Sequence, residues 1–269
     1  MDEKWTKEYL IERLNKVKDM GYVPSRRSVS NVGSVGNTLE DLLGLKENNI
    51  PIANAGRWEL KAQTRLQTKG KAAGSYTTLF HFEPEPREVG VVTNILLPKY
   101  GWPLNENEVS FRSSTFGHRY TDRGFTIDVD RKNQRINFSF DSKKVAASHQ
   151  EWLDGVEEKA GLEQISPQPH WTFDQVRPKV LQKLANVAYV LADLKREVGQ
   201  TCYSYNKAWL MQDIDFDKFI DGIETGRVLI DFDARTGYQR NPHNHGTKFR
   251  INSAVNTFQT FYDNVKRIF

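Results

Sequence analysis

The stretch from Trp58 to Gln63 places the strongest constraint on how this chain can fold. Apolar and polar residues alternate through it, and successive side chains of a strand point to opposite faces. The apolar positions are Trp58, Leu60 and Ala62, and the polar positions are Glu59, Lys61 and Gln63. The sequence therefore predicts a strand with one face on a core, whose other face carries a carboxylate beside an ammonium group.

That polar face has the groups that a metal-dependent phosphodiesterase uses. Hard divalent cations prefer oxygen ligands such as the carboxylate of Glu59, and a bound metal polarises a phosphate and activates a water. A neighbouring lysine such as Lys61 can orient or deprotonate that water. Asn54 precedes the strand across Gly56 and can fold back beside Glu59. The alternative is a surface strand with a solvated Glu and Lys, because short motifs also arise by chance.

Composition narrows the class of protein. A chain of 269 residues can form one large domain or two lobes with a real core. Its 27% charged and 12% aromatic residues are typical of a folded globular chain. The single cysteine, Cys202, excludes an intrachain disulfide and a cysteine-rich metal site. Without an apolar signal segment or a long apolar run, we expect a cytoplasmic protein, and its net charge of +4 is compatible with nucleic-acid binding.

Periodicity predicts an α/β fold in which helices and strands are mixed along the chain. We expect helices at 4–20, from Asn37 or Thr38 to about Asn48, at 143–160, 172–198, 215–224 and 253–267. We expect strands at 58–63, 75–83, 109–116, 123–129, 134–140, 201–211 and 228–232, with the strand at 75–83 able to pair with the first. Prolines and glycines in 84–108 place a lobe boundary there, so that one lobe covers 1–98 and the other 99–269, with some later elements returning to the first.

Two basic segments are candidates for contact with a nucleic-acid backbone. The loop at 24–34 carries Arg26 and Arg27, and a segment rich in small residues carries Arg65, Lys69 and Lys71. Loops of this composition often contact DNA phosphates. For the loop at 24–34, simple solvation is an equally good interpretation.

The stretch from Asp233 to Arg250 mixes hydrogen-bond donors and acceptors around glycine and proline turns. Arginine can bind guanine through two hydrogen bonds, aspartate can accept from cytosine, and histidine can contact adenine or thymine edges. The candidate base-reading residues are Asp233, Arg235, Arg240, His243, His245 and Arg250. The His243-x-His245 pair could instead bind a transition metal, although no third ligand with suitable spacing lies beside it.

These residues resemble a known family. The motifs are Gly33-Ser34-Val35-Gly36-Asn37-Thr38-Leu39-Glu40-Asp41-Leu42-Leu43-Gly44, then Glu47-Asn48-Asn49 and Trp58-Glu59-Leu60-Lys61. Thr77–His81, Asp233-x-Arg235, His243-x-His245 and Arg250 also fit. From about residue 30 to its end, the chain resembles the MvaI/BcnI family of type II restriction endonucleases. That family is related to the nicking enzyme MutH and has the PD-(D/E)XK nuclease core.

The resemblance implies a fold and an activity. The fold would be a PD-(D/E)XK core with a mixed sheet, and two lobes would clamp DNA in a cleft, the first lobe catalytic and the second for recognition. Members act as monomers on double-stranded DNA, nick one strand at a time and read short, nearly palindromic sites such as CC(A/T)GG or CC(C/G)GG. They use Mg²⁺, which Mn²⁺ can replace, and work beside a cognate methyltransferase in the prokaryotic cytoplasm.

The resemblance also assigns roles to residues. Glu59 corresponds to the metal-binding glutamate, Lys61 to the catalytic lysine and Glu40 to a helix glutamate that supports the site. Asp233, Arg235, His243, His245 and Arg250 correspond to residues that read base edges from the major groove.

Asn54 departs from the family pattern, because it stands where the family has its first metal ligand, an aspartate. An amide offers one neutral oxygen in place of two charged ones, so metal binding and turnover should both weaken. Asn54 could be an engineered change that permits binding without cutting, a natural loss of activity, or a residue whose role passes to another carboxylate such as Glu47. Two other functions stay open: a non-catalytic, sequence-specific DNA-binding protein and a MutH-like repair nickase recruited by partners.

Overall fold

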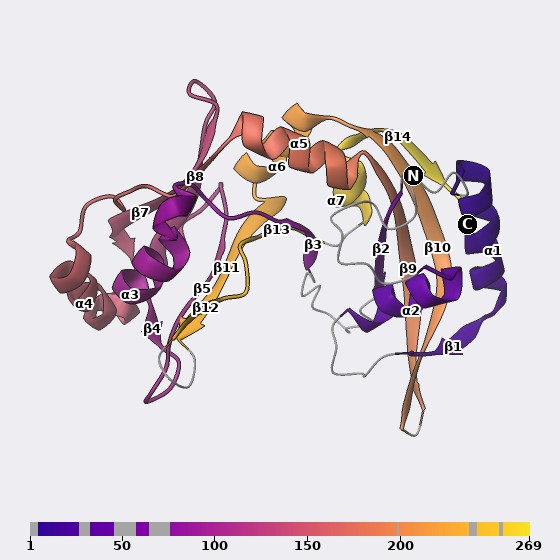
Figure 1. Ribbon diagram of the computed structural model, residues 1–269, viewed down its shortest axis with the longest axis horizontal. Helices are drawn as coiled ribbons and strands as arrows, with labels where there is room; N and C mark the ends of the chain where they lie inside the picture. The colour runs from indigo at the N-terminus through magenta and orange to yellow at the C-terminus, as the bar shows by residue number, and fades with distance from the viewer. Residues whose placement is uncertain are drawn as a thin grey trace. The chain divides into compact units, whose positions relative to one another are not determined.

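The computed structural model describes residues 5–26, 33–45, 58–64, 76–197, 199–236, 241–252 and 255–269 (Figure 1). The chain forms two compact units, and each is described by itself. The first contains Met1–Ser75, Val180–Asp215 and Ser253–Phe269, and the second contains Tyr76–Lys179 and Phe216–Asn252. The units therefore alternate along the chain, and the first division falls at 75/76 rather than at the expected 98/99.

The first unit is built on one mixed sheet. Its strands are β1 (Tyr22–Pro24), β2 (Glu59–Thr64), β9 (Asn186–Glu197), β10 (Gln200–Ile214) and β14 (Tyr262–Arg267). Their order is β1-β10-β9-β2, with β14 also paired to β10. The pair β2–β9 is parallel, whereas β10 is antiparallel to β1, β9 and β14. The helices of this unit are α1 (Lys7–Asp19), α2 (Ser34–Leu43) and α7 (Val255–Gln259).

Helices α1 and α2 bury one face of that sheet. Leu10 and Leu14 of α1 and Leu39 of α2 are fully buried in a cluster with Leu60 of β2 and Val190 of β9. These side chains recur at helical spacing on the helices and at alternate positions on the strands. The opposite face of β9 carries Tyr189, whose ring lies 5.3 Å from that of Phe258 in α7. The sheet is therefore covered on both faces.

The second unit contains two sheets. In the first the order is β3-β13-β11-β5-β4, with β12 paired to β11, and in the second it is β6-β7-β8. The strands are β3 (Tyr76–His81), β4 (Trp102–Pro103), β5 (Val109–Thr115), β6 (Arg123–Asp130), β7 (Arg135–Val145), β8 (His170–Thr172), β11 (Val228–Thr236), β12 (Pro242–Asn244) and β13 (Lys248–Asn252). Helices α3 (Leu97–Tyr100), α4 (Gln150–Ala160) and α6 (Phe216–Glu224) and the short helices Arg87–Val89, Val92–Leu96 and Ala147–His149 complete the unit. Helix α5 (Phe173–Leu184) spans the division between the two units.

Aromatic side chains fill the core of the second unit. Phe138 of β7 stacks on Phe125 of β6 at 5.2 Å and lies 4.6 Å from Phe232 of β11, measured between ring centroids. Phe111 of β5 and Trp171 of β8 join them, and all five are almost completely buried. Large aromatic rings bury much apolar surface for little conformational entropy. One face of the β11 sheet is therefore fixed on this core, which leaves its other face for polar residues.

The predicted α/β class with a mixed sheet is confirmed, but several local predictions are wrong. The expected helix at 172–198 is helix α5 followed by strand β9, because Val187 to Leu191 is a buried apolar run that suits a central strand as well as a helix. The expected helix at 253–267 is likewise split into α7 and β14. The strand at 75–83 pairs with β13 in the second unit, and β2 pairs with β9 instead.

Helix α2 also begins earlier than expected. It starts at Ser34 after Gly33, so Asn37 and Thr38 lie inside it, and the hydroxyl of Thr38 accepts a hydrogen bond from the backbone of Arg26 at 3.1 Å. The helix ends at Gly44, which has a left-handed φ of +77°. Glycine adopts that conformation without steric cost, which makes it a common helix terminator.

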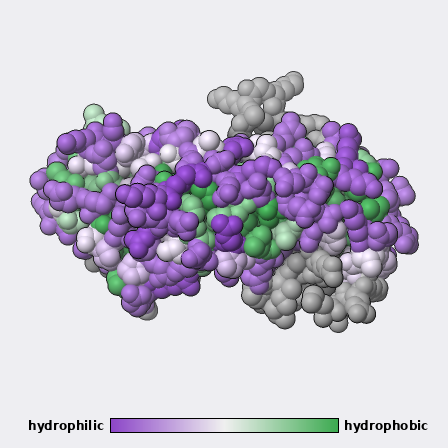
Figure 2. Space-filling model, turned by 90° about the horizontal axis from the view of Figure 1, so that it is seen from above, coloured by the Kyte–Doolittle hydropathy of each residue, from purple (hydrophilic) through white to green (hydrophobic). Residues whose placement is uncertain are grey.

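The face of the molecule drawn in Figure 2 is largely polar. On the face drawn in Figure 2, hydrophilic residues predominate and hydrophobic residues form small groups. Among the described residues, no helix is both long enough and apolar enough to span a membrane.

Candidate functional site

Strand β2 carries the predicted Glu–Lys motif with the expected alternation. Trp58 and Leu60 are buried in the cluster beneath α1 and α2, and Glu59 and Lys61 point to the other side of the sheet. The parallel pairing places Glu59 beside Val187 of β9 and Lys61 beside Tyr189. The motif is thus held by a strand whose other face is buried.

Glu59 is a buried carboxylate with two lysines near it. Lys61 Nζ donates a hydrogen bond to Glu59 Oε1 at 2.8 Å, and the two side chains are 14% and 7% exposed. Lys183 Nζ, at the end of α5, lies 3.9 Å from Glu59 Oε2, and its side chain is 19% exposed. Oε2 is buried and has no hydrogen-bond partner among the described residues. We call Glu59, Lys61 and Lys183 the Glu59 site.

Two tyrosines lie close to this polar face of β2. The hydroxyl of Tyr189 donates to Gln63 Oε1 at 3.3 Å. Tyr262, at the start of β14, has a buried hydroxyl without a hydrogen-bond partner in the described part of the chain. Burial, and then the negative charge of Glu59, raise the pKa of Tyr262 well above its ordinary value. Tyr262 is therefore neutral, and the negative charge of Glu59 acts on its hydroxyl.

The uncommitted oxygen of Glu59 bears on whether this site fits a divalent cation. A buried carboxylate oxygen without a donor is costly unless a cation or a water satisfies it, and carboxylate oxygen is the ligand type that Mg²⁺ prefers. Within the described ranges, no three His, Cys, Asp or Glu residues are grouped to hold a metal. Glu59 therefore fits as one ligand, and the position of a second, Asn54, lies outside the described residues.

The other predicted residues of this region are only partly described. Glu40 is half-buried in α2, a helix that packs on β2. Arg26 is exposed and lies two residues after the end of β1. The remaining candidates lie outside the described residues, namely Arg27, Glu47, Arg65, Lys69, Lys71 and Arg240.

A second group of predicted residues lies on one face of the β11 sheet, in the second unit. Asp231, Asp233 and Arg235 alternate along β11 with buried residues, so they share its polar face. Antiparallel pairing places Lys248 of β13 opposite Asp231 and Arg112 of β5 opposite Asp233. We call the set Arg112, Ser114, Asp231, Asp233, Arg235, Lys248 and Arg250 the polar sheet face.

Asp233 is held from both neighbouring strands. Arg112 Nε donates to Asp233 Oδ1 at 3.1 Å, and Lys248 Nζ donates to Oδ2 at 2.8 Å. Burial alone would raise the pKa of the Asp233 carboxyl. The Lys248 hydrogen bond and charge, with His245 and Arg112, outweigh it and leave this pKa below its ordinary value. The carboxylate is therefore ionised and fixed in orientation.

Asp231 is held in a similar way. Ser114 Oγ donates to its Oδ1 at 2.7 Å, and Arg250 Nη1 donates to its Oδ2 at 2.9 Å. Arg250 also donates from Nη2 to the carbonyl of Tyr76 at 3.0 Å. Two of the donors that would read a base from Arg250 are therefore engaged within the sheet.

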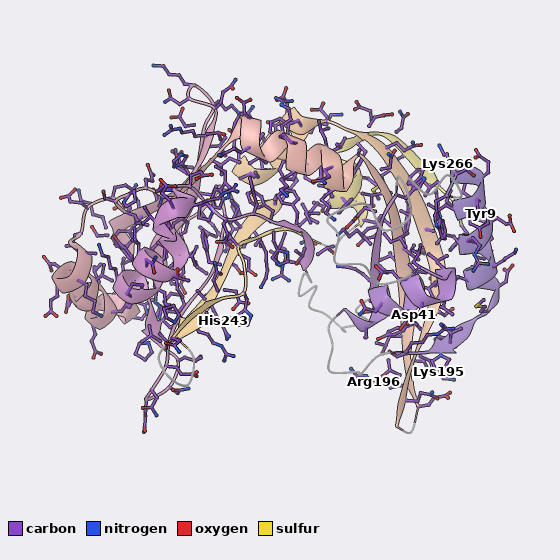
Figure 3. All side chains as sticks on the ribbon, in the orientation of Figure 1. Tyr9, Asp41, Lys195, Arg196, His243 and Lys266 are labelled. Atoms are coloured by element: carbon purple, nitrogen blue, oxygen red, sulfur yellow. The ribbon has the colours of Figure 1, made fainter. Side chains whose placement is uncertain are left out.

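The two histidines continue this surface. His243 on β12 pairs in register with Arg235, and the ring of His245 lies 4.3 Å from that of His243 at 88° (His243 is labelled in Figure 3). The backbone N–H of His245 donates to the carbonyl of Asp233 at 2.8 Å. The structure thus brings Asp233, Arg235, His243 and His245 together, with Asp233 and Arg235 on strand β11 and His243 on strand β12.

Sequence reasoning missed five residues of these sites, namely Arg112, Ser114, Lys183, Asp231 and Lys248. Lys248 lies two positions before Arg250, a strand spacing that could have identified it. Arg112 belongs to an alternating pattern on β5 and could have been found as a polar-face residue, but not as a partner of Asp233. No sequence pattern identifies Lys183 as a site residue, because the pattern of 172–198 predicts one helix with a solvated basic face.

Comparisons with known proteins identify the family and the fold of the chain. The model of the MvaI/BcnI restriction endonuclease family matches residues 11–262. A solved structure of the restriction endonuclease MvaI–cognate DNA substrate complex matches with a TM-score of 0.75 at 25% sequence identity, and the match covers 100% of both chains. A structure of restriction endonuclease MvaI in the absence of DNA matches in fold, with a TM-score of 0.53 at 23% identity over 98% of this chain and 99% of that one. A search of curated proteins gave no significant match.

The fold and the matched family model define a restriction endonuclease, a hydrolase that cleaves DNA. The chain belongs to the MvaI/BcnI restriction endonuclease family. The match extends over both units, so it includes the elements of the Glu59 site and of the polar sheet face.

Proposed function

We propose that the chain is a sequence-specific type II restriction endonuclease that acts as a monomer and nicks one DNA strand at a time. Its target would be a short, G·C-containing pseudopalindrome of the CCNGG kind. The observation that carries this proposal is the buried Glu59–Lys61 pair on β2, in a chain whose whole length matches the family fold. Burial of an ion pair is expensive, so this pair favours a functional role over a solvated surface strand.

The chemistry follows from the two oxygens of Glu59. Lys61 holds Oε1 and leaves Oε2 for a divalent cation, which Glu59 would bind together with the residue at position 54. When bound, Mg²⁺ or Mn²⁺ offsets negative charge on the phosphate and lowers the pKa of a water. Lys61 would orient a water for in-line attack on phosphorus, which would break the bond to the 3′ oxygen and leave a 5′-phosphate and a 3′-hydroxyl. Glu40 supports the site from α2.

The polar sheet face, with His243 and His245, would read the DNA sequence. Arg235 makes no side-chain hydrogen bond with the described part of the chain, so its guanidinium is available for the two acceptors of guanine. Asp233 is ionised and fixed, as an acceptor for the amino group of cytosine must be. This pairing of a guanine donor with a cytosine acceptor supports a G·C-containing site. Arg26 and the basic residues near 27, 65, 69 and 71 would contact the backbone.

The test compares the protein with its Asn54→Asp variant on plasmid DNA in Mg²⁺. If Asn54 weakens a metal site, the variant will produce discrete fragments much faster than the parent, and the fragment ends will give the recognition sequence. Nicked circles that precede linear DNA would support one-strand-at-a-time cleavage by a monomer. Random cleavage, or none by either protein at any metal concentration, would contradict the proposal.

Asn54 itself favours a second candidate, a sequence-specific DNA-binding protein without catalysis. This candidate requires that both proteins bind one duplex sequence tightly in metal and that neither cuts it. A requirement for a partner protein before nicking would instead indicate a MutH-like nickase.

A further inference from the structure

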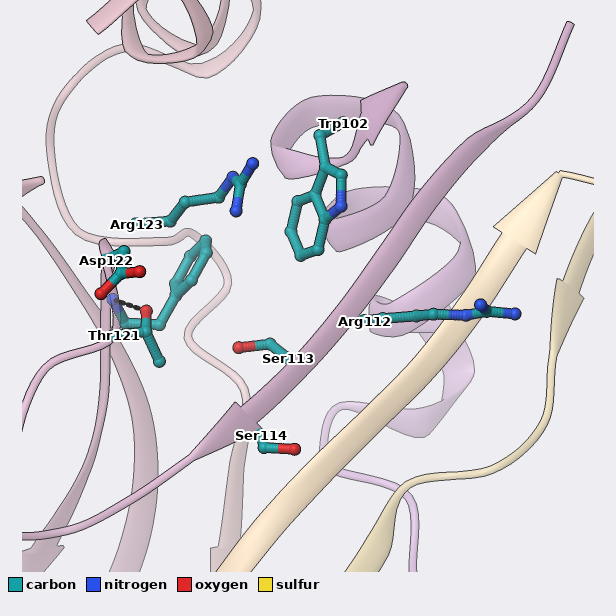
Figure 4. A pocket seen from close by; sticks show the side chains of 8 residues that line it. Trp102, Arg112, Ser113, Ser114, Thr121, Asp122 and Arg123 are labelled. Carbon is teal, nitrogen blue, oxygen red and sulfur yellow. Dashed lines mark hydrogen bonds between the residues drawn. The ribbon is translucent and has the colours of Figure 1, made fainter. Parts of the chain in front are cut away.

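A small pocket in the second unit lies where the start of β6 approaches β5 (Figure 4). Its volume is about 170 Å³, and Trp102, Arg112, Ser113, Ser114, Thr121, Asp122, Arg123 and Phe125 line it. Strand β4 pairs with β5 at Ser110 and Val109, so the pocket lies beside the part of β5 that extends beyond β4. We call it the Arg123 pocket.

Arg123 is the unusual residue of this pocket. Its guanidinium lies 4.2 Å from the ring centroid of Trp102 and 5.5 Å from that of Trp152. Its Nε is buried without a hydrogen-bond partner, and the described residues form no ion pair with it, Asp122 included. Burial lowers the pKa of Arg123 below its ordinary value, and the nearby charge of Asp122 offsets only part of that effect. The two indole rings lie against the guanidinium, but its Nε has no hydrogen-bond partner among the described residues.

The edge of this guanidinium matches one kind of ligand. A planar guanidinium binds the oxygens of a phosphate or carboxylate through two parallel hydrogen bonds in its own plane. The hydroxyl of Thr121 accepts from the backbone of Phe125 at 3.1 Å, which leaves its own proton to donate. A pocket of this volume has room for a phosphate group but not for a whole nucleotide. The donors of Arg123 and Thr121 therefore suit a phosphate group, while Asp122 is the one carboxylate among the residues that line the pocket.

The pocket also adjoins the polar sheet face. Arg112 and Ser114 line it, while their polar groups bond Asp233 and Asp231 on β11, and Figure 4 shows the Arg112 guanidinium extending away from Arg123. A DNA strand whose bases meet the polar sheet face would bring its phosphates near the border of that face. Phosphate contacts of this kind fix the position of a protein on the duplex, while base contacts supply specificity.

We propose that the Arg123 pocket binds a backbone phosphate of the DNA and so fixes the register of the polar sheet face on its site. This inference rests on the proposed function, because it takes DNA as the source of the phosphate. The guanidinium edge of Arg123 and the hydroxyl of Thr121 are the donors. The stacked rings of Trp102 and Trp152 hold the guanidinium in one orientation.

The first test measures equilibrium binding of the full chain to two labelled duplexes in Ca²⁺, one with a CCNGG-type site and one unrelated. We expect Arg123→Gln to weaken binding to both by roughly tenfold, since hydrogen bonds to a charged group are lost. The slope of log K against log salt should fall by about 0.9, the value of one phosphate contact. Arg123→Lys keeps the positive charge but loses the paired donors of the guanidinium. Its affinity for both duplexes should lie between those of the parent and Arg123→Gln.

Arg119→Gln is the matched control. Arg119 also stacks on an aromatic ring, that of Phe116 at 4.3 Å, but it is exposed. This variant measures what the loss of one positive charge does through the long-range field alone. Unchanged binding and salt slope in a folded Arg123→Gln variant would overturn the proposal. So would a loss confined to one base position, because that result is the mark of base readout.

The second test follows the Nε–H resonance of Arg123 by NMR and does not depend on a variant. A shift on adding duplex DNA supports the proposal, with or without a shift on adding inorganic phosphate. A shift with inorganic phosphate but not with DNA would overturn DNA as the source. If the parent binds no duplex at all, the proposed function fails, and the phosphate titration alone then shows whether the pocket binds phosphate.

Discussion

Two regions of this molecule hold a carboxylate in opposite ways. Glu59 is 7% exposed and accepts one hydrogen bond from its own strand. Its second oxygen has no hydrogen-bond partner among the described residues, although Lys183 Nζ lies 3.9 Å from it. Asp233 has a 27% exposed side chain, and a cation from each flanking strand engages one of its oxygens. The first carboxylate is incomplete without a ligand, whereas the second is already satisfied by the protein.

The difference shows what each site can do. An uncommitted buried oxygen suits an exogenous cation, which would compensate the cost of burying the charge. A carboxylate fixed by two cations keeps further lone-pair positions on both oxygens, so it can accept from a base without moving. In the proposed function, the Glu59 site would therefore carry out the chemistry, and the polar sheet face would recognise DNA through its preformed geometry.

The largest effect should follow from Lys61→Ala. Removal of the ammonium group takes away the group that orients the water and holds Glu59, so the cleavage rate should fall roughly 10²–10⁴-fold. DNA affinity should stay close to that of the parent, because the polar sheet face lies in the other unit. Single-turnover cleavage and binding in Ca²⁺ measure the two quantities, in the Asn54→Asp background if the parent does not cut.

Lys16→Ala is the control for that change, since Lys16 is an exposed lysine on α1 paired with Glu12. It should leave the cleavage rate unchanged. Equal rates for Lys61→Ala and its parent would mean that the reaction takes place elsewhere.

A smaller effect, of a different kind, should follow from Asp233→Asn. The amide is isosteric but neutral, so it weakens the hold of Arg112 and Lys248 and presents a donor where an acceptor is needed. We expect discrimination against a site with one changed base pair to fall by about 1–3 kcal/mol, while cleavage of the best site persists. Competition binding with single-substituted duplexes measures this change.

Asp221→Asn provides the comparison for Asp233. Asp221 is an exposed aspartate on α6 that pairs with Arg131. Its substitution should leave discrimination unaltered at every position. If Asp233→Asn weakens all duplexes equally, then Asp233 supports the sheet and does not read a base.

The two regions also differ in how far the sequence predicts them. The alternation around Glu59 and Lys61 is local, so the strand and its polar face follow from the residues themselves. The clamp on Asp233 joins β5 to β11, elements more than a hundred residues apart, and its register depends on tertiary pairing. The mixture of donors in 233–250 predicts a binding surface, but no local pattern identifies Arg112 as the partner of Asp233.

Lys183 shows a further limit of sequence reasoning. The apolar run after Ala185 was compatible with a continued helix, and that interpretation placed the basic residues of 172–198 on a solvated face. In the structure the helix ends at Leu184 and a buried parallel strand follows, which fixes Lys183 near Glu59. Short apolar runs do not distinguish a buried strand from a buried helix, and here that ambiguity concealed a residue of the candidate active site.

Lys183→Met tests how much of the Glu59 site depends on this second lysine. At 3.9 Å from Oε2, Lys183 is too distant for a hydrogen bond but contributes positive charge beside a buried carboxylate. We expect the cleavage rate to fall by roughly tenfold, which is less than for Lys61→Ala, and the metal concentration for half-maximal rate to change. Lys183→Arg, which keeps the charge, should restore most of the rate. If neither variant alters the metal dependence, Lys183 is not part of the site.

The smallest expected effect is that of Tyr262→Phe on the free energy of unfolding. The Tyr262 hydroxyl is buried without a hydrogen-bond partner among the described residues, so it was desolvated on folding without compensation. Its removal leaves the ring packed against Phe258, at 5.9 Å between centroids, and should leave the free energy of unfolding unchanged or raise it by about 1 kcal/mol.

Tyr205→Phe is the opposite case, because the Tyr205 hydroxyl donates to the carbonyl of Val35 at 2.7 Å. Loss of that hydroxyl should lower the free energy of unfolding. Denaturant unfolding of both variants makes the comparison. A clear loss of stability in Tyr262→Phe would mean that the hydroxyl has a partner, a water or a bound cation at the Glu59 site being the nearest candidates.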